Sequence, residues 1–257
     1  TPQEIFFYRF LIAYIGIWVI SPKRLFTGNW KDELWLVAGG IFGGSLYFFT
    51  ENTALGITQA SNVSFIICTA PLLTTILSLL FYKSEKASKG LIYGSLLALM
   101  GVGLIVFNGS FVLKISPIGD LLTLLAALSW AFYSLIIKKM AGRYPTVFIT
   151  RKIFFYGVLT ILPAFLLHPL QPDAAVLLQP GVLFNLLFLA VLASLICYVL
   201  WNVVLKQLGT VRASNYIYLN PLVTMIASSL ILDEKITLVA LGGAACIVCG
   251  VYWAEKK

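Results

Sequence analysis

The hydrophobic positions of this chain form long runs that are apolar on every side, separated by short polar breaks rich in Gly, Pro, Ser and Lys. A helix that crosses the hydrocarbon core of a bilayer needs about 20 mostly apolar residues. Strands of a membrane barrel are shorter and alternate polar with apolar positions, unlike these runs. The pattern predicts an all-α, polytopic membrane protein with nine spans, at residues 5–20, 34–53, 60–81, 90–107, 118–137, 147–167, 182–205, 213–232 and 236–254.

The composition supports this reading. Apolar residues make up 60% of the 257 residues and charged residues 11%, whereas about 25% of a soluble domain is charged. Such a chain cannot cover a water-facing surface, which excludes a soluble enzyme, a nucleic-acid-binding protein and a secreted disulfide scaffold. The four cysteines lie inside apolar runs, so we expect no metal site, no cofactor and no redox role.

Lysine and arginine are distributed unequally between the two sets of loops that nine spans create. Thirteen lie in the loops on one side and at the C-terminus, two lie in loops on the other side, and three lie inside spans. In membrane proteins the basic excess belongs to cytoplasmic loops. We therefore expect an integral protein of a bacterial inner membrane, with its C-terminus in the cytoplasm and residue 1 outside.

The sequence repeats itself in order, which indicates an internal duplication. We assign residues 1–110 to a first repeat and residues 111–257 to a second. The matching positions are Ala60-Ser61-Asn62 with Ala213-Ser214-Asn215, Pro71 with Pro221, Gly94 with Gly243, and Gly101 with Gly250.

The second repeat contains one more predicted helix than the first. The run at 118–137 precedes Pro145, the match of Pro2, and nothing in the chain corresponds to it. We expect two repeats of five helices, with the first helix absent from this chain and needed for full transport. Because each repeat has an odd number of helices, the second repeat starts on the opposite side of the membrane from the first. The two repeats therefore have opposite topology, which is the inverted-repeat architecture of secondary transporters.

The motifs resemble those of the EamA family, part of the drug/metabolite transporter superfamily. They are Pro-x6-Arg at 2–9, Ala-Ser-Asn followed by Pro and Ser-Glu-Lys at 60–86, Ala-Leu-Ser-Trp-Ala-Phe-Tyr-Ser at 127–134, and Tyr-Leu-Asn-Pro followed by Asp-Glu-Lys at 218–235. The resemblance covers the whole chain and implies export of amino acids or related small metabolites by alternating access, through a central cavity between the repeats.

Polar side chains inside the predicted spans are the candidates for function, since charge at membrane depth is costly. Glu51 shares a helical face with Gly40, Gly44 and Tyr47, which suits a cavity wall, while the alternative is a carboxylate at the outer interface. Arg9 has Glu4, Glu51 or Asp120 as candidate partners, or serves packing alone. The candidate substrate-binding or coupling residues are Glu51, Tyr47, Arg9, Trp130, Tyr133, Trp201, Asn202 and Asn220.

Pro71 and Pro221 lie near the middles of two predicted spans, at matching positions of the repeats. Each proline removes a backbone donor and frees the carbonyl one turn earlier. Paired interruptions near the midplane are typical of transporter binding sites, so we expect gating kinks here; static kinks for packing are the alternative.

Two other classes compete with a secondary transporter. An intramembrane enzyme lacks support, because the chain has no HExxH motif and its single histidine, His168, lies in a predicted loop. No Walker A loop is present either, so the chain itself does not use ATP. A lipid-linked flippase of the same architecture stays open. The small-molecule substrate, any coupling to protons and the oligomeric state are left open.

We predict that a cysteine placed at Ser84, in a lysine-rich loop, is protected from an impermeant thiol reagent in intact cells, because the charge distribution puts that loop in the cytoplasm. The measurement is labelling before and after permeabilisation in a cysteine-free background. A cysteine at Gln171, on the opposite predicted side, should be labelled in both conditions. Labelling of position 84 in intact cells would overturn the predicted topology.

Overall fold

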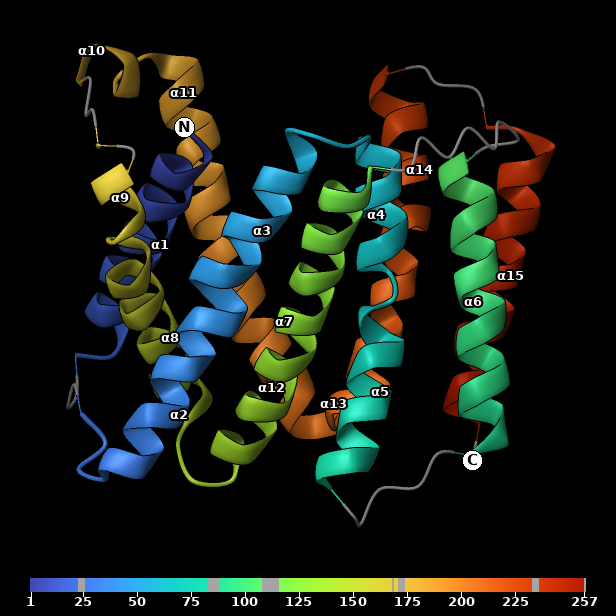
Figure 1. The fold of residues 1–257 in the computed structure, drawn as a ribbon, viewed down its shortest axis with the longest axis horizontal. Coiled ribbons are helices and arrows are strands. Elements are labelled where there is room, and N and C mark those ends of the chain that lie inside the picture. The colour runs from blue at the N-terminus through green and yellow to red at the C-terminus, as the bar shows by residue number, and fades with distance from the viewer. Residues whose placement is uncertain are drawn as a thin grey trace. The chain divides into compact units, whose positions relative to one another are not determined.

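The computed structural model describes residues 1–22, 26–82, 88–107, 116–167, 169–170, 174–232 and 236–256. These residues are almost entirely helical, and no strand occurs among them (Figure 1). The all-α membrane fold predicted from the apolar runs is therefore confirmed. Several loops that carry the predicted topology, including Ser84 and His168, lie outside the described residues.

Seven helices of the described chain are long and apolar enough to span a membrane. They cover Pro2–Ile20, Ala60–Phe81, Lys89–Phe107, Pro117–Ala141, Thr146–Leu166, Pro180–Leu208 and Leu238–Glu255. The other two predicted spans are helical as well, within α2 to α3 (Trp30–Leu55) and α13 to α14 (Thr210–Leu232), but they are not among these seven. The count of nine spans stays a prediction.

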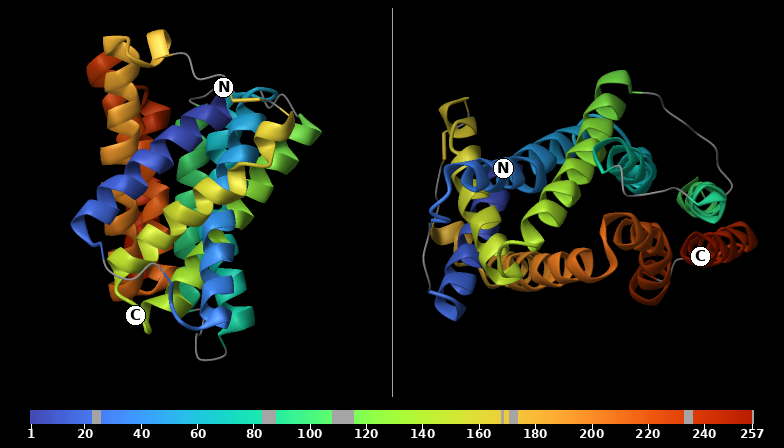
Figure 2. Two further views of the ribbon diagram at one scale, coloured as in Figure 1. Left: turned by 90° about the vertical axis from the view of Figure 1, so that its left-hand side faces the viewer. Right: turned by 90° about the horizontal axis from the view of Figure 1, so that it is seen from below.

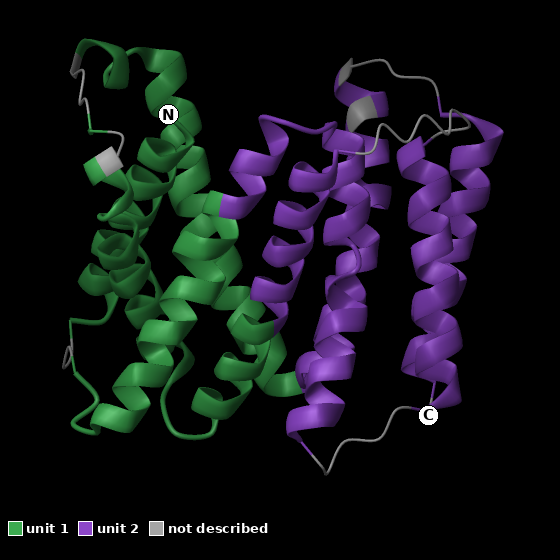
Figure 3. Cartoon of the chain, viewed as in Figure 1, with its two compact units in different colours: residues 1–49, 132–207 green, residues 50–131, 208–257 purple. Residues whose placement is uncertain are grey.

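The chain packs as two compact units (Figure 3). Unit 1 consists of residues 1–49 and 132–207, and unit 2 of residues 50–131 and 208–257. Each unit thus combines segments from both predicted repeats. The repeat boundary at residue 110 is defined by sequence similarity and the units by packing, so the two divisions describe different properties.

Unit 1 contains α1 (Pro2–Ile20), α2 (Trp30–Gly40), the π-helix η1 (Ile41–Ser45), α8 (Thr146–Ile161) and α11 (Pro180–Leu187). It also contains the π-helix η2 (Phe188–Ile196), nearly all of α12 (Cys197–Leu208), and the short helices α9 (Ala164–Leu167) and α10 (Ala174–Leu177). Its core is aromatic: the Phe10 ring lies 5.1 Å from Phe154 and 5.7 Å from Tyr198. Edge-to-face packing of this kind is favourable for aromatic rings.

Unit 2 contains α4 (Ala60–Ile67), α5 (Ala70–Phe81), α6 (Lys89–Phe107) and the first part of α7 (Pro117–Ala141). Its second chain segment forms α13 (Thr210–Asn215), the 3-10 helix η3 (Tyr216–Leu219), α14 (Asn220–Leu232) and α15 (Leu238–Glu255). The end of α3 (Leu46–Leu55) belongs to it as well.

Helices α6 and α15 lie side by side along their length (Figures 1 and 2). A Cβ atom added to Gly101 would lie 2.5 Å from the Gly243 carbonyl oxygen, and one added to Gly250 would lie 2.5 Å from the Gly94 carbonyl oxygen. The residues pair in opposite chain directions, so the two helices are antiparallel. Small residues permit this close approach where lipid provides no hydrophobic drive for association. Gly94 matches Gly243 in the repeat and Gly101 matches Gly250, but in the structure Gly94 packs against Gly250 and Gly101 against Gly243. An inverted duplication predicts this exchange of partners.

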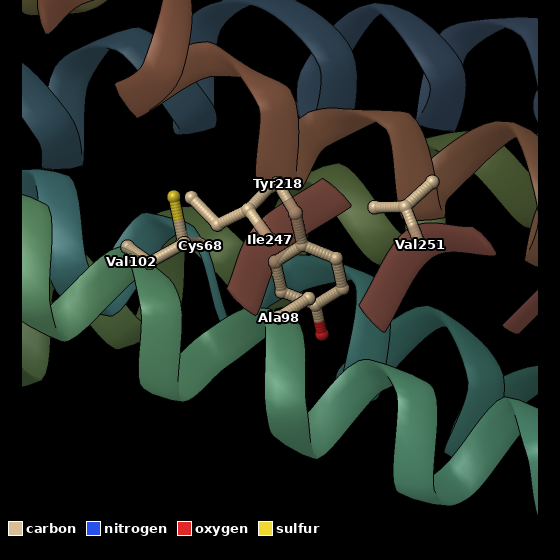
Figure 4. Packing of buried hydrophobic residues seen from close by; sticks show 6 residues of the cluster. All are labelled: Cys68, Ala98, Val102, Tyr218, Ile247 and Val251. Atoms are coloured by element: carbon tan, nitrogen blue, oxygen red, sulfur yellow. The ribbon is translucent and has the colours of Figure 1, made fainter. Parts of the chain in front are cut away.

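Six buried residues form an apolar layer in unit 2: Cys68, Ala98, Val102, Tyr218, Ile247 and Val251. Figure 4 shows the Tyr218 ring among the side chains of this layer, with its hydroxyl pointing away from Cys68 and Val102. The layer joins α6 and α15 to the interrupted helices, and it thereby holds the interruptions in place.

Both proline-containing segments are interrupted. Helix α4 ends at Ile67 and α5 begins at Ala70, just before Pro71. On the other segment, the four residues of η3 separate α13 from α14, which begins at Asn220 and has Pro221 next. Short 3-10 stretches within a helix mark hinges or strain. The predicted interruptions are present, and their action as gates stays a prediction.

We predict that Gly101→Ala lowers the thermal stability of the protein, because the new methyl group would collide with backbone atoms of α15. Overpacking of this kind costs about 1–3 kcal/mol. The matched control is Gly242→Ala on α15, where nothing lies within 4 Å of an added Cβ; the better helix propensity of alanine should leave its stability unchanged or slightly raised. Equal melting temperatures for the two variants would contradict the close packing.

Candidate functional site

A pocket of about 460 Å³ opens in unit 2. Its wall is built from the end of α3, from α4, from the end of α6, and from the beginnings of α14 and α15. The lining residues are Glu51, Leu55, Ala60, Ser61, Val63, Ser64, Ile67, Cys68, Ile105, Val106, Asn220, Pro221, Thr224, Met225, Ile236 and Ala240. The volume lies within the range of small-molecule sites.

Both helix interruptions of unit 2 reach this pocket. Ile67 and Cys68 line it at the end of α4, and Asn220 and Pro221 line it at the start of α14. Because Pro71 has no N–H group, the Ile67 carbonyl cannot accept the helical hydrogen bond that its position would otherwise have. The pocket therefore lies where backbone acceptors are released from the helices.

The pocket combines one carboxylate with neutral polar groups and apolar walls. Glu51 is the one charged side chain among the described residues that line it, and it is half-buried. Ser61 and Ser64 on α4, and Asn220 and Thr224 on α14, add hydroxyl and amide groups. This arrangement can bind a cationic ammonium group and hydrogen-bond a neighbouring carboxylate or carbonyl group.

The predicted shared face of Gly40, Gly44, Tyr47 and Glu51 stays a prediction, and its glycines have contacts in unit 1 whereas Glu51 lines the pocket of unit 2. Gly40 packs against the backbone of Gly157 on α8, and Gly44 packs against the Phe10 ring, so both face helices of unit 1. The prediction assumed 3.6 residues per turn throughout, whereas the π-helix η1 lies between Gly40 and Glu51. A π-turn contains an extra residue and rotates all following side chains.

Two predicted site residues, Tyr133 and Asn202, meet in unit 1. The Tyr133 hydroxyl donates a hydrogen bond of 2.8 Å to Asn202 Oδ1, and Asn202 Nδ2 donates one of 2.9 Å to Thr150 Oγ1. All three residues are buried. The three side chains satisfy one another's hydrogen-bonding groups, and these hydrogen bonds hold α7, α8 and α12 together.

Other contacts of unit 1 involve its two π-helices. The Tyr198 hydroxyl donates a 2.6 Å hydrogen bond to the carbonyl of Gly43 in η1. Arg9 Nε donates a 2.8 Å hydrogen bond to Ser194 Oγ in η2, and the Arg9 guanidinium carbon lies 4.7 Å from the centre of the Phe48 ring. Hydrogen bonds from the side chains of Tyr198 and Arg9 thus stabilise the two π-helices.

The other predicted residues do not line the pocket of unit 2. Tyr47 packs against Phe48, with ring centres 5.0 Å apart. Trp130 on α7 and Trp201 on α12 are half-buried. Asp120, a candidate partner of Arg9, accepts a 3.2 Å hydrogen bond from the backbone N–H of Ser116 at the start of α7, which is a helix-capping contact.

A charged cluster ties the start of α2 to α8. Glu33 forms an ion pair with the fully buried Lys152 and accepts a hydrogen bond from the Tyr156 hydroxyl. Burial raises the pKa of the Glu33 carboxyl, but hydrogen bonds from Lys152, Tyr156 and Thr27 lower it further, to about 2. Glu33, just before the predicted span at 34–53, is therefore ionised at neutral pH.

A second ion pair lies beside this cluster. Arg143 Nη1 lies 2.5 Å from Asp32 Oδ1, and the Tyr144 hydroxyl donates a 2.8 Å hydrogen bond to Asp32 Oδ2. Burial and the contact with Asp32 raise the pKa of Tyr144. Both acidic residues belong to the first turn of α2, where negative charge complements the helix dipole.

Sequence reasoning missed Ser61, Ser64 and Thr224 as pocket residues. Ser61 belongs to the repeated Ala-Ser-Asn motif, Ser64 follows it by three positions, and Thr224 follows Pro221 by three positions. Residues three apart share a helical face, so extending the motif and the proline along their helices would have found all three. Cys68 carried no comparable signal, because it lies in an apolar run.

The chain is similar to proteins named as transporters or efflux pumps over nearly all of its length. It is 29% identical over 260 residues to an uncharacterized transporter of Archaeoglobus fulgidus, covering 100% of this chain and 88% of that protein. It is 27% identical over 248 residues to a protein of Salmonella typhimurium named a probable amino-acid metabolite efflux pump, covering 91% of this chain and 81% of the relative.

A solved crystal structure shares the fold, with a TM-score of 0.81 at 18% identity, over 99% of this chain and 87% of that one. The model of the EamA-like transporter family matches residues 1–107 and 117–254. With the apolar helices described above, this match makes the protein an integral membrane transporter of small molecules and not an enzyme, and the chain belongs to the EamA-like transporter family.

Proposed function

We propose that the protein exports small amino compounds, foremost neutral amino acids, and that it binds them in the pocket of unit 2. One observation carries the proposal: Glu51, the one carboxylate among the described lining residues, lies in a mainly apolar pocket that both interrupted helices reach. The name of the Salmonella typhimurium relative supports the same class of substrate.

The ammonium group of the substrate is the part that the pocket recognises most strongly. Glu51 supplies a full negative charge, and the Ile67 carbonyl supplies an acceptor that Pro71 leaves without its helical donor. Hydrogen bonds in which one partner is charged are about twice as strong as neutral ones. The substrate carboxylate finds donors in the Asn220 amide and the hydroxyls of Ser61 and Ser64.

The rest of the pocket selects for an apolar side chain. Its walls include Val63, Ile105, Val106 and Met225, and a volume of about 460 Å³ accommodates an amino acid of moderate size. A second charge on the substrate side chain would have no counter-charge among the described lining residues. We therefore expect neutral aliphatic amino acids to be transported in preference to acidic ones.

Transport by alternating access requires the pocket to open on each side of the membrane in turn. Discontinuous helices are the elements that flex in many transporters. The break at residues 68–69 and the 3-10 turn η3 supply such elements at the wall of the pocket. We infer that α5 and α14 move relative to α4 and α13 as the pocket changes its accessibility.

Two roles of Glu51 in transport are consistent with the proposed function, namely carrying a proton and binding the substrate ammonium group. If it takes up and releases a proton during the cycle, transport is coupled to protons and depends on this titration. If it stays ionised, it binds the substrate ammonium group without coupling. Both roles require the carboxylate, and the first alone requires that it titrate in the working pH range.

We predict that Glu51→Gln lowers export of neutral amino acids about tenfold or more, because it removes the charge of a charge-assisted hydrogen bond. The measurement is transport of a panel of labelled amino acids by the full-length protein in proteoliposomes, at several pH values between about 5.5 and 8. The matched control is Asp120→Asn, which changes an acidic residue of unit 2 that does not line the pocket.

A loss of rate together with a flattened pH profile indicates the proton-carrying role, and a loss of rate with an unchanged profile indicates ammonium binding. An unchanged rate and profile for Glu51→Gln would refute the proposed site. Labelled lipids in the same vesicles test the flippase alternative, since their movement without amino acid transport would refute the proposed substrate.

We predict that Pro221→Ala lowers turnover more than folded yield, because it restores a backbone donor at the interruption and straightens a helix that has to flex. The measurements are transport rate per folded molecule and yield by size-exclusion chromatography. Pro117→Ala is the control, since Pro117 begins α7, where a missing N–H group costs nothing. Equal losses of yield and turnover in Pro221→Ala would indicate a static packing role.

A further inference from the structure

Unit 2 contains a second group of polar side chains that the pocket does not include. Thr74, Thr210, Ser214, Asn215 and Tyr218 are each 0% exposed. Thr74 Oγ1, Thr210 Oγ1, Ser214 Oγ and Asn215 Nδ2 have no hydrogen-bond partner among the described residues, and Tyr218 Oη lies beside the hydroxyl of Ser95. We call these five residues the inner polar cluster. Buried polar groups nearly always have partners in native proteins, so four unpartnered groups in one unit require an explanation.

The elements that carry the cluster pack against one another. Helix α13, with Thr210, Ser214 and Asn215, packs against α5, which carries Thr74, and η3, with Tyr218, packs against α5 and α6. Ser95 on α6 donates a 3.4 Å hydrogen bond to Asn215 Oδ1. This contact orients the Asn215 amide and leaves its Nδ2 group as a donor within the cluster.

A smaller pocket of about 260 Å³ lies at one end of the cluster. Thr75 and Leu79 of α5, Leu91 of α6, and Val211 and Arg212 of α13 are among its lining residues. Its position near the C-terminal Lys256 places it on the predicted cytoplasmic side. It is therefore the inner counterpart of the pocket that contains Glu51.

Helix α6 passes four levels of unit 2 in order. Leu91 lines the inner pocket, Ser95 contacts the cluster about 6 Å further along the helix, and Ala98 and Val102 belong to the apolar layer. Ile105 then lines the pocket that contains Glu51.

The segment from α13 to α14 passes the same levels. Val211 lines the inner pocket, Ser214 and Asn215 belong to the cluster, Tyr218 belongs to the cluster and the apolar layer, and Asn220 lines the pocket with Glu51. The cluster thus lies between the two pockets, and a single apolar layer, shown in Figure 4, separates it from the pocket with Glu51.

Water molecules or the polar groups of a ligand satisfy such a cluster, whereas a metal cation does not. Asn215 Nδ2 can only donate hydrogen bonds, and the hydroxyls both donate and accept. None of the five side chains carries a charge to balance a buried cation. Water matches this mixture of donors and acceptors, and so does a zwitterion, whose ammonium and carboxylate groups balance each other's charge.

We propose that the inner polar cluster is an inner binding site on the transport route, which ordered water fills when no substrate is present and which binds the ammonium and carboxylate groups of the substrate in transit. The substrate part rests on the proposed function, while the hydration part does not. The apolar layer of Cys68, Val102 and Tyr218 then closes the route between the inner site and the pocket with Glu51.

Hydration of the site is tested by X-ray radiolysis of the full-length protein in H2(18)O, with mass spectrometry of oxidised tyrosines. Bound water generates hydroxyl radicals locally, so Tyr218 should be oxidised although it is 0% exposed. Tyr133 is the matched control, because it is equally buried and its hydroxyl is bonded to Asn202. Modification of Tyr218 no greater than that of Tyr133 would show that the cluster is dry.

The direction in which the melting temperature changes in variants of the cluster gives an independent test of its hydration. Thr74→Val and Ser214→Ala remove one hydroxyl each with little change of volume. If the hydroxyls bind water, the melting temperature should fall by about 2–4 °C; if they are unsatisfied, it should rise, because an unpaired buried group is removed. Thr123→Val is the control for the loss of a hydroxyl that is bonded within the protein, since the Thr123 hydroxyl donates a 2.7 Å hydrogen bond to the Gly119 carbonyl. An unchanged or raised melting temperature in both cluster variants overturns the proposal.

Transport separates this inference from the proposed function. Thr74→Val and Ser214→Ala should slow transport about threefold to tenfold, the loss expected for one hydrogen bond to the substrate. Full transport in both variants would refute the inner site as part of the route, even where Glu51→Gln is inactive and the proposed function stands. If Glu51→Gln is fully active while Tyr218 is labelled and both cluster variants lose stability, the proposed substrate site fails and the hydrated cluster stands.

Discussion

The hydrocarbon core of a bilayer provides no hydrogen-bond partners, so the protein itself has to satisfy each peptide group that lies within it. Continuous helices meet this requirement over most of the chain. The segments beside Pro71 and Pro221 depart from it, and a carbonyl that loses its helical donor, such as that of Ile67, is tolerated where it faces protein or a polar cavity. The pocket with Glu51 lies at these breaks, so its position follows from the places where the helices cannot continue.

The same environment explains how unit 2 holds its interrupted helices. Lipid is as apolar as a leucine side chain, so helices associate in it through close packing more than through burial of apolar surface. Glycines provide this packing between α6 and α15, where backbone meets backbone at Gly94, Gly101, Gly243 and Gly250. Two regular helices thereby support the less regular α4–α5 and α13–α14 segments, and they leave those segments to form the pocket and the inner polar cluster.

The two units differ in how their buried polar groups are satisfied. In unit 1, Tyr133, Asn202 and Thr150 bond to one another, and Lys152 is paired with Glu33. Such mutually satisfied groups fix the helices that carry them. In unit 2, the hydroxyls of Thr74, Thr210 and Ser214 have no partner among the described residues, and in unit 1 the same holds for the hydroxyl of Tyr8. The pocket with Glu51 is therefore the reason for the ligand-binding role proposed for unit 2, and the buried network of unit 1 is the reason for the structural role proposed there.

The features that depend on local chemistry could be predicted from the amino-acid sequence. The apolar runs predicted the membrane helices, Pro71 and Pro221 predicted the interruptions, and Glu51 and Asn220, chosen for their polarity at membrane depth, line the pocket of unit 2. Only the tertiary structure decided which side chains meet. Tyr133 and Asn202, expected in a cavity, bond to each other, and the π-helix η1 interrupts the regular turns between Gly40 and Glu51. Both outcomes depend on packing between distant segments, which a one-dimensional pattern with a fixed period of 3.6 residues does not contain.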